Sequence, residues 1–452
     1  MLNPKLKQNP AVSFIFFYSL FFISFTSCSI QKQISKSANA TLKDPSLTTA
    51  HVGISIYEPA TNKWWFNYQG DHYFVPASNT KIPTCYAAMK YLGDSLSGTI
   101  STENDTALFI LPTADPTLLH PYFKNQPVVD YLTRTKKKIY TTDNRWQEEA
   151  LGSGWSWNDY NEAYMAERSP MPIYGNVIKW VQEKENDDPA IIYSIPEVNW
   201  QVNFDTARSK TFSVVRNVSE NIYEMRESIE KKKEQDVPFV THGIKASVEL
   251  LSDSIHNPIG LLSPKAAQKI FTNSRLHFNF IHSQPTDSLL KPMMHRSDNF
   301  FAEQSLLMVS NQLLGVMNDE KIIDTLLKTD FKDLPQRPRW VDGSGLSRYN
   351  LFSPQDFVFI FNKMKNEFGM DRIKNILPTG NEGTLSNYYK PENGYIFAKT
   401  GTLSGVVSLS GFLYTKKNKL LIFSILVNNH NSSATAVRRA VEKFVEGLRN
   451  KY

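Results

Sequence analysis

The sequence predicts an α+β fold in which helices cover an antiparallel sheet and a β-rich domain is inserted into the chain. Two observations lead to this fold. Strand-like apolar runs occur at both ends of the 452-residue chain, and the last of them is followed by a helical pattern. A long interval with its own strand-like runs separates the two ends. One sheet is therefore expected to take its strands from both ends of the chain.

The strands of this sheet form a predicted hairpin and a predicted meander. His51–Tyr57 and Lys63–Tyr68 are joined by a turn with proline and asparagine, which favours an N-terminal hairpin. Three apolar runs between residues 395 and 427 indicate a meander with a turn at Lys416–Lys419. A C-terminal helix from about 434 to 449 would cover the sheet.

The interval 99–284 is interpreted as an inserted domain or a pair of subdomains. It has no clear internal repeat, and its β-rich runs lie at 190–194, 200–204 and 211–215. The main domain would then comprise residues 46–98 and 285–452.

The N-terminus predicts export. Two lysines precede a mostly apolar run at 11–27, which is too short and too closely followed by polar residues for a permanent membrane helix. Residues 1–28 are therefore interpreted as a signal peptide. The string 25–28 resembles a bacterial lipoprotein cleavage box, so that Cys28 would be lipidated and residues 31–49 would form a tether. Plain cleavage after a small residue is the alternative, and both place the protein in a bacterial periplasm or cell envelope.

Composition narrows the function. Apolar residues make up 41% and charged residues 21%, as in ordinary globular proteins. Removal of residues 1–27 lowers the net charge from +6 to +4, too little to indicate a nucleic-acid partner. The nine histidines form no metal-binding pattern, so we expect neither a metal nor a cofactor. Cys85, within a helical pattern, is expected to be a buried and inert thiol.

Ser78-Asn79-Thr80-Lys81 combines a hydroxyl and an amine at the start of a helical pattern. Pro76 biases the preceding segment toward extended geometry, and Gly93 suits the stop of the helix. Unpaired N–H groups and the helix dipole would stabilise an oxyanion here, with Lys81 on the same face. The same Ser-x-x-Lys spacing also occurs at Ser29, Ser228 and Ser288. Context therefore singles out Ser78, against the alternative of an ordinary serine N-cap with a solvated lysine.

Ser297-Asp298-Asn299 precedes an apolar helical stripe that would anchor it. In an extended turn Ser297 and Asn299 share one side, so that one can relay a proton while the other binds an amide. Asp298 would point elsewhere. A turn that merely caps the next helix is the alternative.

Lys399-Thr400-Gly401-Thr402 lies on the first strand of the meander. Alternation places Lys399 and Gly401 on one face and the two threonines on the other, so a local distortion is expected if Lys399 and Thr400 face one cleft. Gly401 would let a substrate backbone approach closely. The alternative is a charged residue at the end of a strand.

In this order, the three motifs resemble the active-site signature of the penicillin-recognising serine enzymes, which comprise D,D-peptidases and serine β-lactamases. The long interval between Ser78 and Ser297 implies an insertion, as in the D-alanyl-D-alanine carboxypeptidase/endopeptidase group of peptidase family S13, the penicillin-binding protein 4 type. Further strings similar to that family are Asp115–Leu118, Gly154–Asp159, His295–Glu303 and Asp342–Arg348. Asp143 matches the substrate-contacting aspartate of the family's insertion only weakly, and a surface loop aspartate is the alternative.

The resemblance implies a β-lactamase/transpeptidase-like fold and an acyl-enzyme mechanism. Ser78 would attack the carbonyl carbon of a D-alanyl-D-alanine bond with neutral Lys81 as the base, whose pKa a nearby Lys399 and partial burial would lower. The N–H groups of Ser78 and Thr402 would form the oxyanion hole. Ser297 would pass the proton to the leaving amine.

Substrate binding is assigned by the same resemblance. Asn299 would hold the substrate amide, and Lys399 and Thr400 the terminal carboxylate, beside Gly401 and Thr402. The partners would be peptidoglycan stem peptides, with β-lactams as covalent inhibitors. Two other functions stay open: a serine β-lactamase, although no Glu-x-x-x-Asn string lies between residues 300 and 398, and an inactive envelope protein that only binds peptidoglycan.

Overall fold

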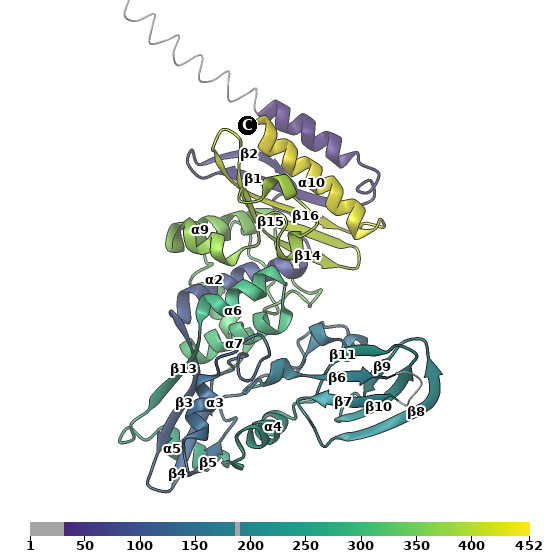
Figure 1. The fold of residues 1–452 in the computed structure, drawn as a ribbon. Coiled ribbons are helices and arrows are strands. Elements are labelled where there is room, and N and C mark those ends of the chain that lie inside the picture. The colour runs from purple at the N-terminus through teal and green to yellow at the C-terminus, as the bar shows by residue number, and fades with distance from the viewer. Residues whose placement is uncertain (1–30, 186–189) are drawn as a thin grey trace, which may run out of the picture.

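The computed structural model describes residues 31–185 and 190–452 (Figure 1). The predicted signal peptide at 1–28, with Cys28, lies outside the described residues. Among the residues that are described, no helix combines the length and the apolar character that crossing a membrane requires.

One five-stranded antiparallel sheet takes its strands from both ends of the chain. Its order is β14-β15-β16-β1-β2. The strands are β1 (His51–Glu58), β2 (Lys63–Tyr68), β14 (Ile396–Leu403), β15 (Val406–Tyr414) and β16 (Leu420–Asn428). The predicted hairpin and meander are confirmed, and they are joined where β1 pairs with β16.

Helices cover both faces of this sheet (Figure 1). On one face, α10 (Ala434–Lys451) confirms the predicted C-terminal helix. Residues 31–42 are also helical, and Ile34 and Ala38 are fully buried in the same core. The expectation that 31–49 forms a tether is therefore wrong for this part of the segment, because its apolar residues pack on the sheet domain.

The opposite face of the sheet supports the helices that carry the motifs. α9 (Pro354–Ile376) lies against the sheet, and α2 (Lys81–Tyr91), α6 (Thr286–His295) and α7 (Asn299–Leu314) pack with it in one large core. α8 (Asp319–Lys328) packs against α7. Gly93, just after the C-cap of α2, has φ +69°, as its predicted role as a helix stop requires.

Three further sheets lie between Ser95 and Pro285, below the main sheet in Figure 1. Their orders are β12-β5-β4-β3-β13, β11-β6-β7 and β8-β10-β9. The strands are β3 (Ser95–Glu103), β4 (Ala107–Pro112), β5 (Lys138–Thr141), β6 (Val177–Glu183), β7 (Ile191–Ile195), β8 (Gln201–Ser209), β9 (Ser213–Arg216), β10 (Ile222–Ser228), β11 (Lys232–Pro238), β12 (Ile259–Leu261) and β13 (Asn279–Pro285). The helices α3 (Pro127–Thr133), α4 (Lys245–Ile255) and α5 (Pro264–Phe271) accompany them.

The first and last strands of this interval lie side by side, because β3 pairs with β13. The chain therefore leaves the main domain and returns to it at nearly one place. The three predicted β-rich runs coincide with β7, β8 and the start of β9. The exact division at 99–284 stays a prediction.

Candidate active site

Ser78 lies in a single 3₁₀ turn, Ala77–Thr80, immediately before α2. Ala77 has φ +48°, a conformation that costs energy for a residue with a Cβ. Strand β15 holds the turn in place: Ser408 Oγ donates to Pro76 O (2.7 Å), and Asn79 Nδ2 donates to Ser410 Oγ (2.7 Å). The serine is thus fixed at the start of the helix, as the sequence predicts.

Lys81 connects the first two motifs from a fully buried position. Its Nζ donates to Ser78 Oγ (3.1 Å), to Asn299 Oδ1 (2.6 Å) and to the carbonyl oxygen of Ser344 (2.8 Å). Each of these partners comes from a different segment of the chain. The amine therefore has a fixed direction toward the hydroxyl of Ser78.

Burial is the main reason why the pKa of Lys81 is lowered to about 8, although the charges of Asp342, Glu303 and Asp298 oppose the shift. The sequence had suggested that the cation of Lys399 contributes to this shift. The repulsion between the two lysines instead adds to burial in lowering the pKa of Lys399 well below its ordinary value.

The second motif uses each of its residues differently. Ser297 has φ +61°, and its Oγ accepts a hydrogen bond from Lys399 Nζ (2.8 Å). Asn299 begins α7, where Oδ1 meets Lys81 and Nδ2 donates to the carbonyl oxygen of Tyr164 (3.0 Å). Asp298 points away and caps α7, with its Oδ1 accepting from the N–H of Phe301 (3.0 Å). The motif therefore does both things that the sequence left as alternatives: Asp298 caps the helix, and Ser297 and Asn299 bond to the two lysines.

The third motif lies on a regular strand. The pairing of β14 with β15 is unbroken from Ile396 to Leu403, so the distortion considered for this strand is absent. Lys399 is fully buried on one face, whereas Thr400 Oγ1 donates to Thr384 Oγ1 (2.8 Å) on the other. The two side chains therefore do not line one cleft, contrary to the expectation that they act together.

Gly401 permits a close approach, but of the protein's own backbone. A Cβ at this position would lie 2.8 Å from Pro76 O and 2.9 Å from Ser78 N. The strand can therefore lie directly against the Ser78 turn only because residue 401 has no side chain. This role differs from the predicted approach of a substrate.

A pocket of about 740 Å³ opens where the three motifs meet, within the size range of ligand sites. Ser78, Ser297, Asn299 and Thr402 contribute to its lining from the motifs. The inserted segment contributes Gly154, Ser156, Asn158, Asp159, Tyr164 and Met165. Gly345, Leu346, Arg348, Leu403 and Ser404 complete the lining.

Asp159 and Arg348 give this pocket two charged side chains that lie outside the three motifs. Each belongs to a string that we had identified, Gly154–Asp159 or Asp342–Arg348, so the signal was present. Asp143 does not line the pocket and lies near Gly243. The acidic residue of the insertion that reaches the pocket is therefore Asp159.

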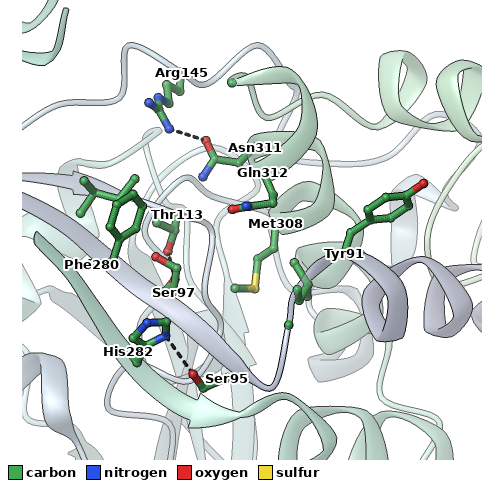
Figure 2. Close-up of a pocket in the computed structure, with 14 residues that line it drawn as sticks. Tyr91, Ser95, Ser97, Thr113, Arg145, Phe280, His282, Met308, Asn311 and Gln312 are labelled. Atoms are coloured by element: carbon green, nitrogen blue, oxygen red, sulfur yellow. Dashed lines mark hydrogen bonds between the residues drawn. The ribbon is translucent and has the colours of Figure 1, made fainter. Parts of the chain in front are cut away.

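A second cavity, of about 470 Å³, lies at the C-terminal ends of α2 and α7, away from the three motifs (Figure 2). Tyr91 and Met308 contribute to its lining from the two helices, and Arg145 Nη1 donates to Asn311 Oδ1 (3.1 Å) among the other lining residues. His282 Nδ1 and Ser95 Oγ lie 2.9 Å apart on the facing strands. No residue of the three motifs lines this cavity.

Two curated relatives are similar to this chain over most of its length. A D-alanyl-D-alanine carboxypeptidase of Actinomadura sp. is 24% identical over 90% of this chain and 84% of its own length. The carboxypeptidase DacB of Haemophilus influenzae is 23% identical over 89% of this chain and 90% of its own.

The fold is shared with a solved structure. Penicillin-binding protein 4 (dacB) of Haemophilus influenzae superimposes with a TM-score of 0.71 at 21% identity, over 92% of this chain and 99% of that one. The family model of the D-Ala-D-Ala carboxypeptidase 3 (S13) family matches residues 34–449. Since this match covers most of the chain, the protein belongs to the D-Ala-D-Ala carboxypeptidase family S13 of serine peptidases.

Proposed function

We propose that this S13 peptidase hydrolyses D-alanyl-D-alanine-type bonds of peptidoglycan stem peptides through an acyl-enzyme on Ser78. It would act both as a carboxypeptidase and as an endopeptidase. The observation that carries the proposal is the contact between a fully buried lysine amine, Lys81 Nζ, and the Ser78 hydroxyl at 3.1 Å. A buried amine beside a hydroxyl at a helix start suits nucleophilic catalysis without histidine.

Acylation begins when Lys81 takes the proton of Ser78 and Ser78 Oγ attacks the carbonyl carbon. A pKa of about 8 leaves part of the Lys81 population neutral near neutral pH, as a general base must be. The N–H groups of Ser78 and Thr402 would stabilise the oxyanion. As the tetrahedral intermediate collapses and its C–N bond breaks, Ser297 would give its hydroxyl proton to the departing amine and regain one from Lys81, which took it from Ser78. Lys399 Nζ, hydrogen-bonded to Ser297 Oγ, supports that relay.

The substrate would be held by polar groups of the second and third motifs. The Oδ1 of Asn299 is engaged by Lys81, so the hydrogen of Nδ2 that Tyr164 leaves free would bind the substrate amide. A terminal carboxylate beside Lys399 would restore the positive charge that burial disfavours. Because the side chains of Thr400 and Thr402 share the opposite face of the strand, we assign the attraction of the carboxylate to Lys399, whose buried amine lies behind Ser297 at the pocket.

Water would then hydrolyse the acyl-enzyme. A β-lactam would acylate Ser78 in the same way and leave slowly. Membership of a carboxypeptidase family favours peptide hydrolysis over the two other functions, β-lactamase and inactive binding protein. The substrate implies a place in the cell envelope, and we propose export through residues 1–28 with a lipid anchor on Cys28.

The test is covalent labelling with a fluorescent penicillin, together with release of D-alanine from a disaccharide pentapeptide. Ser78→Ala should abolish both signals. Ser288→Ala is a matched control, because Ser288 is exposed and has the same Ser-x-x-Lys spacing. Labelling that persists in Ser78→Ala would refute the proposed nucleophile.

A further inference from the structure

Asp342 is a fully buried carboxylate in the loop next to the active site, and four neutral donors surround it. Its Oδ1 accepts from the N–H of Gly345 (2.8 Å) and from Asn350 Nδ2 (2.7 Å). Its Oδ2 accepts from the N–H of Ser347 (2.6 Å) and from Trp155 Nε1 (3.0 Å). Both oxygens thus act only as acceptors.

This arrangement requires a carboxylate. An asparagine in the same position would turn its NH₂ group toward two donors, whichever way the amide is flipped. Burial raises the pKa of Asp342, and the four hydrogen bonds oppose the shift. The carboxylate therefore binds three donors of its own loop and one donor of the inserted segment at a single point.

The loop that Asp342 holds touches the catalytic lysine. The carbonyl oxygen of Ser344 accepts from Lys81 Nζ (2.8 Å), and the N–H of Ser344 donates to Glu303 Oε1 (2.7 Å). A Cβ on Gly345 would lie 1.9 Å from Ala77 O, so this loop is pressed against the Ser78 turn. Any movement of the loop would therefore be transmitted to the amine of Lys81.

The fourth donor comes from the inserted segment. Trp155 stands between Gly154 and Ser156, which both line the substrate pocket. The Trp155 ring also lies over the guanidinium of Arg168, with 5.5 Å from Cζ to the ring centre, and Arg168 in turn pairs with Glu303. The wall of the pocket and the loop behind Lys81 thus meet at a single carboxylate.

We propose that Asp342 is a positioning residue that holds the Trp155 wall of the substrate pocket and the Ser344 carbonyl behind Lys81 in one fixed arrangement. This inference rests on the proposed function of Ser78 and Lys81. It gives the inserted segment a defined contribution to catalysis, since the segment shapes the pocket from the same anchor that orients the base.

The experiment measures the saturation constant and the acylation rate constant separately, for penicillin and for a pentapeptide substrate. Asp342→Asn should reduce the acylation rate constant about 100-fold, because a displacement of about 1 Å is enough for such a loss. Trp155→Phe should raise the saturation constant about tenfold and leave the rate constant nearly unchanged, because it removes only the wall's bond. Trp157→Phe is the matched control, since Trp157 is 78% exposed and does not bond to Asp342.

All rates are normalised to the fraction of enzyme that penicillin titrates. A merely structural role of Asp342 lowers that fraction and the melting temperature, but changes neither constant per active molecule. If Asp342→Asn does not fold, Trp155→Phe decides: a wild-type saturation constant overturns the proposal. If the wild-type chain itself takes no label, the proposed function has failed instead.

Discussion

The helices α2 and α7 pack side by side, and the two ends of this pair differ in which residues adopt a left-handed backbone conformation. At the C-terminal ends the left-handed positions are taken by Gly93 and Gly315, with φ +69° and +68°. At the N-terminal ends, Ala77 and Ser297 adopt φ +48° and +61° although both carry a Cβ. The strained positions thus lie at the motif end of the pair, where neighbouring strands and loops hold them.

The lysines of α2 show the same contrast. Lys90, near the C-terminal end, is partly exposed, and its pairing with Asp330 raises its pKa against the effect of partial burial. Lys81 at the other end is fully buried, and its pKa is lowered to about 8. One helix therefore carries a charged surface lysine and a buried lysine that is partly neutral near neutral pH, which teaches that environment, not residue type, sets the chemistry.

Removing each amine in turn should give the largest difference between the two ends. Lys81→Met should reduce acylation by penicillin about 10²- to 10⁴-fold, the usual value of a general base. Lys90→Met should leave acylation unchanged and reduce the stability by about 1 to 3 kcal/mol, because Asp330 loses a charged donor. Stopped-flow labelling and urea unfolding measure the two effects. Equal losses of acylation would show that the two lysines do not differ in function.

Glycine substitutions test the strained end against the relaxed end. Gly401→Ala should lower the acylation rate about 100-fold, because its Cβ would force the strand away from the Ser78 turn. Gly93→Ala meets no atom within 4 Å and should leave acylation intact. Its left-handed φ should cost about 1 to 2 kcal/mol of stability. A Gly401→Ala enzyme with normal acylation would contradict the close approach described here.

The smallest expected effect is the change in the acylation rate constant with each pH unit. Only neutral Lys81 can accept the proton, so the rate constant should fall about tenfold per pH unit below the pKa of about 8 and level off above it. The rate at saturating substrate, measured between pH 6 and 9.5, checks this profile. A rate that is flat down to pH 6 would exclude Lys81 as the base.

The sequence was sufficient for the main sheet, because β1, β2 and β14 to β16 carry clear apolar patterns. The order of the three motifs, and their resemblance to a known family, also predicted that they lie in one site. The direction of Thr400 could be derived from strand alternation, but the absence of a bulge could not. The network around Asp342 was not predictable, since it depends on contacts among Trp155, Asn350 and a loop, and no periodic pattern encodes such contacts.

The pairing of His51 with Asn428 joins two strands that lie at opposite ends of the sequence, which has a consequence for folding. β1 cannot find its neighbour β16 until nearly the whole polypeptide has been synthesised, whereas the strands between Ser95 and Pro285 are complete much earlier. Long-range pairing of this kind slows folding and leaves edges open to aggregation in the meantime. We therefore expect the Ser78 site to assemble late, since a truncated chain that lacks β16 has no strand to join β15 to β1.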